Sequence, residues 1–170
     1  MTIKSKGVMI SITVAVTLTL TTAATIYSLA NLVLAQGAPT FPYDLSGSKE
    51  VPPVQTDATG VIEITPMGAD SIAYSVNATN IEGVTAGHMH LGKQGENGPI
   101  VVTLFNYDSP MNGVSESGTI TADKLEGPMA GTQISDLAAA GANGTIYFNI
   151  HTEQNLDGEI RGQSGTPTNQ

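Results

Sequence analysis

The three histidines of this sequence are the residues whose type and spacing best suit metal chemistry, and two of them are one residue apart. His88 and His90 lie within the segment 86–92, and His151 lies near the C-terminus. Residues i and i+2 of an extended strand point to the same face. His88 and His90 therefore project side by side, while Met89 faces the core. A paired strand that carries His151 would bring three imidazoles together.

The segment around His151 has the matching pattern. In residues 146–152, isoleucine and phenylalanine alternate with other residues, so that Tyr147, Asn149 and His151 share the opposite face. The pattern predicts that all three histidines lie outside the hydrophobic core, on an outer sheet surface. The turn-rich loops 92–99 and 153–158 are expected to cover them.

Neutral imidazole binds copper and zinc well, and a histidine site without thiolates suits copper(II) or zinc rather than calcium. The sequence contains no cysteine, which excludes thiolate ligands and disulfides. We therefore predict one copper ion, with zinc as the alternative, at His88, His90 and His151. The competing interpretation is that the histidines hydrogen-bond to loop carbonyls or carboxylates and hold the loops in place.

Acidic residues near His151 supply candidates for a fourth ligand or for an outer layer around the metal: Glu153, Asp157 and Glu159. Glu159 and Arg161 are i, i+2 neighbours in the last predicted strand, so they share a face. They are expected to form a charge-assisted pair or to reach neighbouring loops. If the protein were a copper enzyme, Arg161 would steer an anion toward the metal.

The charge of the chain limits its partners. After residue 40 there are four basic side chains against all fifteen acidic ones, a net charge of −11. Such an acidic domain repels phosphate backbones, which argues against nucleic-acid binding.

The first 35 residues differ from the rest. Lys4 and Lys6 precede a stretch from Val8 to Ala35 without any charge, longer than the ~20 residues that cross a bilayer. Residues 1–35 are predicted to be a signal peptide or an N-terminal membrane anchor, which implies an extracellular or cell-surface location. The membrane is otherwise not an expected partner.

The remaining chain is predicted to fold as one all-β domain. Residues 36–42 form a linker, 43–163 the domain and 164–170 a disordered tail. About eight short strands separated by glycine turns favour an antiparallel Greek-key sandwich or flattened barrel. The apolar run 100–105 predicts a buried central strand. The single short helix is expected near residues 133–140, with Gly141 ending it.

Two sequons mark candidate glycosylation sites. Asn77 and Asn143 each begin an Asn-x-Thr triplet at a predicted strand end or turn.

Several motifs together resemble the chordin-domain (CHRD) family. They are the segments 45–54, 58–60, 84–92, 97–102, 147–152 and 158–163, and the resemblance covers roughly residues 43–163. It implies an extracellular β-rich domain of the kind found as repeats in chordin and singly in many microbial secreted proteins. It implies fold and location better than activity.

A fainter similarity exists to copper-zinc superoxide dismutase. That family also carries a His-x-His pair on an outward strand face of a Greek-key barrel, with a later histidine completing the copper ligands. This chain lacks a fourth, bridging histidine and lacks the disulfide. The resemblance therefore implies a mononuclear copper site rather than a dinuclear one.

Three functional hypotheses follow. The first is a secreted or surface-anchored metal-binding domain for copper storage, delivery or redox buffering. The second is a non-catalytic extracellular module that interacts with another protein and has structural histidines. The third is an enzyme that uses copper and oxygen species. No nucleophile triad, phosphate loop or catalytic carboxylate pair is present in the pattern.

Overall fold

The computed structural model describes residues 38–165. The predicted leader at 1–35 and residues 166–170 of the predicted tail lie outside the described residues. Within residues 38–165, no helix is long and apolar enough to span a membrane.

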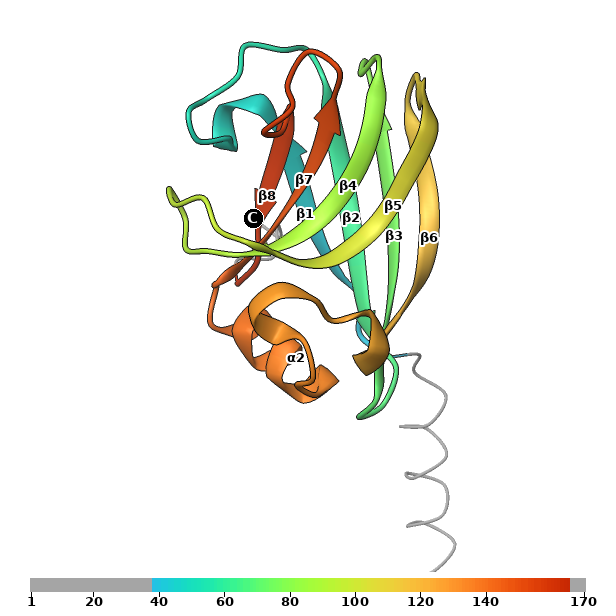
Figure 1. Cartoon of the computed structure of the whole chain (residues 1–170), viewed down its shortest axis with the longest axis vertical. Coiled ribbons are helices and arrows are strands. Elements are labelled where there is room, and N and C mark those ends of the chain that lie inside the picture. Colours follow the sequence, from blue (N-terminus) through green and yellow to red (C-terminus); the bar gives the residue numbers. More distant parts are fainter. Residues whose placement is uncertain (1–37, 166–170) are drawn as a thin grey trace, which may run out of the picture. The chain divides into compact units, whose positions relative to one another are not determined.

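The described chain forms one eight-stranded sheet in which every pairing is antiparallel (Figure 1). The first strand begins just before the domain boundary predicted at residue 43. The strands are β1 (Phe41–Ser46), β2 (Thr59–Pro66), β3 (Ser71–Thr79), β4 (Val84–Leu91), β5 (Ile100–Met111), β6 (Val114–Thr121), β7 (Ile146–Thr152) and β8 (Ile160–Gln163).

The sheet curls into a nearly closed barrel. Its strand order is β5-β4-β7-β8-β1-β2-β3-β6, so β5 and β6 are the two edges although they are consecutive in the chain. Side chains link these edges: the Tyr107 hydroxyl on β5 donates to Glu116 Oε1 on β6 at 2.9 Å. The Tyr74 hydroxyl on β3 also donates to the carbonyl of Leu104 on β5. The predicted all-β antiparallel architecture is confirmed.

The hydrophobic core lies on the inner face of this sheet. Met89 of β4 and Phe148 and Ile150 of β7 are buried in it, as the alternation of these segments predicted. The opposite faces of β4 and β7 are therefore free to carry polar side chains under covering loops.

The prediction that residues 100–105 form a central strand is wrong. Val101 and Val102 are fully buried, but β5 is at the edge of the sheet order. A segment containing the short 3₁₀ helices η2 (Ala122–Lys124) and η3 (Gly127–Met129) covers part of that edge. Glu126 N donates to the Val101 carbonyl at 2.9 Å, and its carboxylate accepts from Thr103 Oγ1 at 2.7 Å. This covering segment, rather than a second flanking strand, explains the apolar run.

The predicted helix is present as α2 (Ile134–Ala142), at one end of the sheet (Figure 1). A capping box between Gln133 and Asp136 begins it. Gly141 does not end the helix. Gly144, with a φ of +69°, takes the left-handed position after the Asn143 cap instead. One further 3₁₀ turn, η1 (Gly47–Lys49), follows β1.

Candidate metal centre

The three histidines come from two neighbouring strands. β4 and β7 are antiparallel partners, in a register that pairs His88 with Asn149 and His90 with Tyr147. His151 pairs with Ala86, which lies on the same face as His88. The sheet therefore brings the third histidine beside the His-x-His pair.

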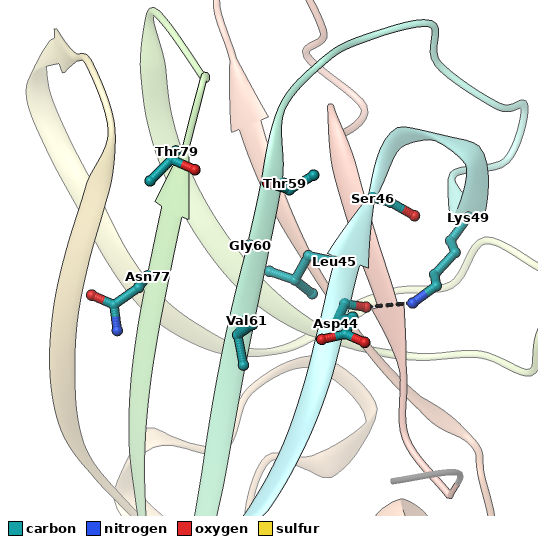
Figure 2. A pocket seen from close by; sticks show the side chains of 9 residues that line it. All are labelled: Asp44, Leu45, Ser46, Lys49, Thr59, Gly60, Val61, Asn77 and Thr79. Carbon is teal, nitrogen blue, oxygen red and sulfur yellow. Dashed lines mark hydrogen bonds between the residues drawn. The ribbon is translucent and has the colours of Figure 1, made fainter. Parts of the chain in front are cut away.

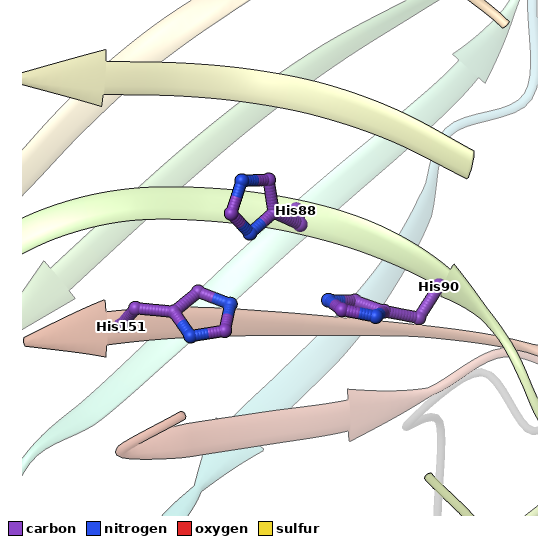
Figure 3. A group of neighbouring side chains, drawn as sticks. All are labelled: His88, His90 and His151. Carbon is purple, nitrogen blue, oxygen red and sulfur yellow. The ribbon is translucent and has the colours of Figure 1, made fainter. Parts of the chain in front are cut away.

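The three rings point toward one another (Figure 3). Ring centroids are 4.7 Å apart for His88 and His151, 5.7 Å for His88 and His90, and 6.0 Å for His90 and His151. One nitrogen of each ring lies within 4.8 Å of the others. Metal–nitrogen bonds of about 2.1 Å hold three nitrogens roughly 3.5 Å apart. A separation of 4.8 Å would have to shorten by roughly 1.3 Å to reach that spacing.

Hydrogen bonds to loop carbonyls determine which ring nitrogens are free. Nδ1 of His90 lies 2.9 Å from the Gly98 carbonyl, and Nδ1 of His151 lies 2.8 Å from the Leu156 carbonyl. A carbonyl only accepts, so Nδ1 carries the hydrogen in both rings and Nε2 keeps its lone pair. Nε2 of both rings and Nδ1 of His88 are buried without a hydrogen-bond partner. Each ring therefore keeps one unused nitrogen.

All three rings are uncharged at neutral pH. Burial, followed by the neighbouring His151 and His90, lowers the pKa of His88 to about 4. Burial also lowers the pKa of His90 and of His151, and it outweighs the carbonyl hydrogen bonds that act in the opposite direction. The neutral imidazole is the form that binds metal ions.

None of the predicted carboxylate candidates joins the cluster. Among residues 38–165, the group of mutually close histidine and carboxylate ligand atoms around this site contains the three histidines alone. The Glu159 carboxylate instead accepts hydrogen bonds from Thr56, Thr152 and Asn155. It therefore ties the loop after η1 to the loop after β7.

Arg161 is also placed beside the loops and is 1% exposed. Its Nη atoms donate to the carbonyls of Lys93 and Glu96 and to the side chains of Asn97 and Gln163. None of these bonds goes to Glu159. The guanidinium thus fixes the loop whose Gly98 carbonyl holds His90.

Tyr147 connects this arginine to the histidines. Its ring is stacked on His90, and the Arg161 guanidinium carbon lies 3.5 Å from its ring centroid. Its hydroxyl accepts from Gly98 N at 3.1 Å. Tyr147 therefore positions both His90 and the covering loop.

Sequence reasoning missed the roles of Glu50 and Asn149. Both are buried, and each has an oxygen atom without a hydrogen-bond partner: Oε1 of Glu50 and Oδ1 of Asn149. Burial raises the pKa of Glu50 to about 7, while Arg161 acts to lower it. The alternation in residues 146–152 placed Asn149 on the same face as His151, and this was the only signal in the sequence for a role of Asn149 at the site. Glu50 follows η1, and no local pattern connects it to β7.

The two sequon asparagines lie apart from the histidines. Asn77 is exposed on β3 and lines a shallow hollow of about 450 Å³ with Val61 and Lys49 (Figure 2). Asn143 is exposed at the end of α2. Both asparagines are exposed, as the acceptor of an N-linked glycan must be. Glycosylation at either position stays a prediction.

Comparisons with known proteins give one match. The family model of the CHRD domain matches residues 41–164. No curated protein and no solved structure matches the chain.

Proposed function

The chain belongs to the CHRD domain family, and we propose that it is an extracellular or cell-surface domain that binds one metal ion. The proposed ligands are His88, His90 and His151. The proposed metal is copper, with zinc as the alternative, because neutral imidazoles suit both.

One observation carries this proposal: three uncharged imidazoles meet, and each keeps one buried nitrogen that has no hydrogen-bond partner. Leaving a buried polar atom unsatisfied costs about 1–3 kcal/mol. Three such atoms in one place are unfavourable in a purely structural cluster, and a bound metal ion would satisfy all of them.

The test is titration of the purified chain with copper(II) and with zinc(II), in competition with a chelator of known affinity. We expect a stoichiometry of one, and a loss of at least a hundredfold in affinity for His88→Ala and for His151→Ala. Unchanged affinity in either variant would contradict the three-histidine site. An Asn143→Ala variant, changed at an exposed position away from the histidines, is the matched control.

The second candidate is a non-catalytic interaction module in which the histidines are structural. The bonds of His90 and His151 to the Gly98 and Leu156 carbonyls favour it, because they already hold the covering loops. This candidate expects a melting temperature that is independent of metal and is lowered by histidine substitution.

The location follows from the leader. We propose that residues 1–35 export the domain, as a cleaved signal peptide or a retained anchor. Mass spectrometry of the mature N-terminus and fractionation of the producing cells would test this.

A further inference from the structure

Asn149 lies at the remaining corner of the histidine cluster. On the outer face of the sheet, β4 contributes His88 and His90, and β7 contributes Asn149 and His151. His88 lies directly opposite Asn149. His90 lies two residues further along β4, opposite Tyr147, and His151 lies two residues the other way, opposite Ala86. The four positions His88, His90, Asn149 and His151 therefore form a parallelogram on this face. Three corners carry imidazoles and the fourth carries an amide.

The amide has a defined orientation. Asn149 is 2% exposed, and its Nδ2 donates to the Asp157 carbonyl at 3.2 Å. Since a carbonyl cannot donate, the nitrogen must face Asp157 and the oxygen must lie on the other side of the amide. That oxygen, Oδ1, is buried without a hydrogen-bond partner. It is thus in the same unsatisfied state as the three histidine nitrogens.

Glu50 and Gly158 hold the amide from behind. A Cβ atom at Gly158 would collide with both Glu50 Oε1 and Asn149 Nδ2, so these two atoms lie against the same backbone position. Glu50 and Gly158 therefore lie on the nitrogen side of the amide.

The oxygen side of the amide faces away from Asp157, and the neighbouring side chains of β4 on this face of the sheet are those of His88 and His90. Nδ1 of His90 is used by the Gly98 carbonyl, so the nitrogen that this ring has free for a metal ion is Nε2.

We infer that Oδ1 of Asn149 is the fourth ligand atom of the metal site, which makes the ligand set three imidazole nitrogens and one amide oxygen. This inference rests on the proposed function and deepens it. Glu50 acts as a positioning residue for Asn149. An amide oxygen is a hard ligand, so the site selects divalent zinc or copper(II) over the softer copper(I).

The experiment compares two variants of the purified full chain, Asn149→Leu and Asn149→Asp. Leucine keeps much of the volume and removes the oxygen, so we expect zinc(II) affinity to fall at least tenfold. Aspartate keeps an oxygen and adds a negative charge, so we expect zinc(II) affinity to rise at least tenfold. In the copper(II)-loaded protein, the electron paramagnetic resonance spectrum should change in both variants.

Asn77→Leu, which removes an exposed amide on β3, is the matched control and should bind as the unaltered chain does. If Asn149→Leu does not fold, Asn149→Asp alone decides. Zinc(II) affinity within threefold of the unaltered chain in the folded Asn149 variants would overturn the inference. If His88→Ala still abolished binding in that case, the three-histidine proposal would stand. Absence of binding by the unaltered chain would overturn both.

Discussion

The rings of His90 and Tyr147 are stacked, with centroids 4.7 Å apart and planes inclined by 9°. The guanidinium of Arg161 covers the tyrosine ring at 3.5 Å. A cation, an aromatic ring and a candidate metal ligand thus form one buried stack. The orientation of His90 is determined from two directions, by this stack and by the Gly98 carbonyl.

Substitutions at Tyr147 separate these two effects. Tyr147→Phe keeps the stack and loses the hydroxyl contacts to Gly98, so we expect a loss of about 1 kcal/mol in the free energy of unfolding. Tyr147→Leu removes the stack as well, so its metal affinity should be lower than that of Tyr147→Phe by a factor of about 10–100. Urea unfolding and chelator competition measure the two quantities. Equal metal affinity in both variants would mean that the stack does not position His90.

Metal should stabilise the fold. At a free metal concentration of 100 times Kd, binding adds about 2.7 kcal/mol to the free energy of unfolding. For a domain of this size, that corresponds to a rise of roughly 10 °C in Tm. Differential scanning calorimetry with and without chelator gives this value. The double variant His88→Ala/His151→Ala should show no metal-dependent rise, and an unchanged rise there would place the metal elsewhere.

Metal affinity should fall less than it would for ordinary histidines as the pH is lowered from about 7.5 to 5.5. Three histidines of ordinary pKa near 6.5 lose about 1,000-fold in affinity between pH 7.5 and 5.5, because protons compete for each nitrogen. Burial lowers the pKa of all three rings, that of His88 to about 4. We therefore expect a smaller loss, below about a hundredfold, in zinc titrations across this range, because the lowered pKa of His88 removes one of the three tenfold factors. A full 1,000-fold loss would indicate rings with ordinary pKa values.

Glu50→Gln tests the buried carboxyl. The pKa of Glu50 is raised from 4.5 to about 7 in the folded protein, so between these values the folded state binds more protons than the unfolded state. The stability from Glu50 is therefore present at low pH and is lost as pH rises through about 7. Glutamine mimics the protonated form, so the variant should gain up to about 3 kcal/mol over the unaltered chain between pH 5 and 8.5.

Urea unfolding of both proteins at each pH measures this difference. The histidines act in the opposite sense, because their lowered pKa makes stability fall as pH drops below about 6.5. Comparison of the two proteins at the same pH cancels that effect. A difference that does not change with pH would show that Glu50 has an ordinary pKa.

Gly158→Ala should damage the buried polar cluster. Gly158 has a φ of +128°, and an added Cβ would collide with Glu50 and Asn149. We expect a loss of at least 2 kcal/mol in the free energy of unfolding together with weaker metal binding. Gly95→Ala is the matched control, since Gly95 also has a positive φ, +82°, but an added Cβ there meets nothing within 4 Å. That variant should lose only about 1 kcal/mol. Similar losses in both variants would show that backbone strain alone is responsible.

The convergence of the histidines was predictable because it depends on strand alternation alone. The period of two placed His88 and His90 on one face and His151 on the corresponding face of its own strand. The all-β architecture followed from the short strands and frequent glycine turns. The loops 92–99 and 153–158 were also expected to cover the histidines, and carbonyls of both loops contact the rings.

The remaining parts of the site depend on long-range contacts. The pairing of Asn149 with His88 is a matter of register between distant strands, and register is set by the whole sheet. Glu50 reaches Asn149 from the turn after β1, and nothing in its local sequence marks it as buried. The edge position of β5 could not be predicted either. A continuous apolar run is expected both for a strand flanked by two strands and for an edge strand covered by a 3₁₀ segment.

The pairing of β4 with β7 also determines when a chain gains its full set of ligands. β5, β6 and α2 are all synthesised between the two strands. An incomplete chain that ends before β7 holds the His88–His90 pair and neither Asn149 nor His151. The complete ligand set therefore appears only in chains synthesised through His151, so its formation reports that β7 has been made and has paired with β4.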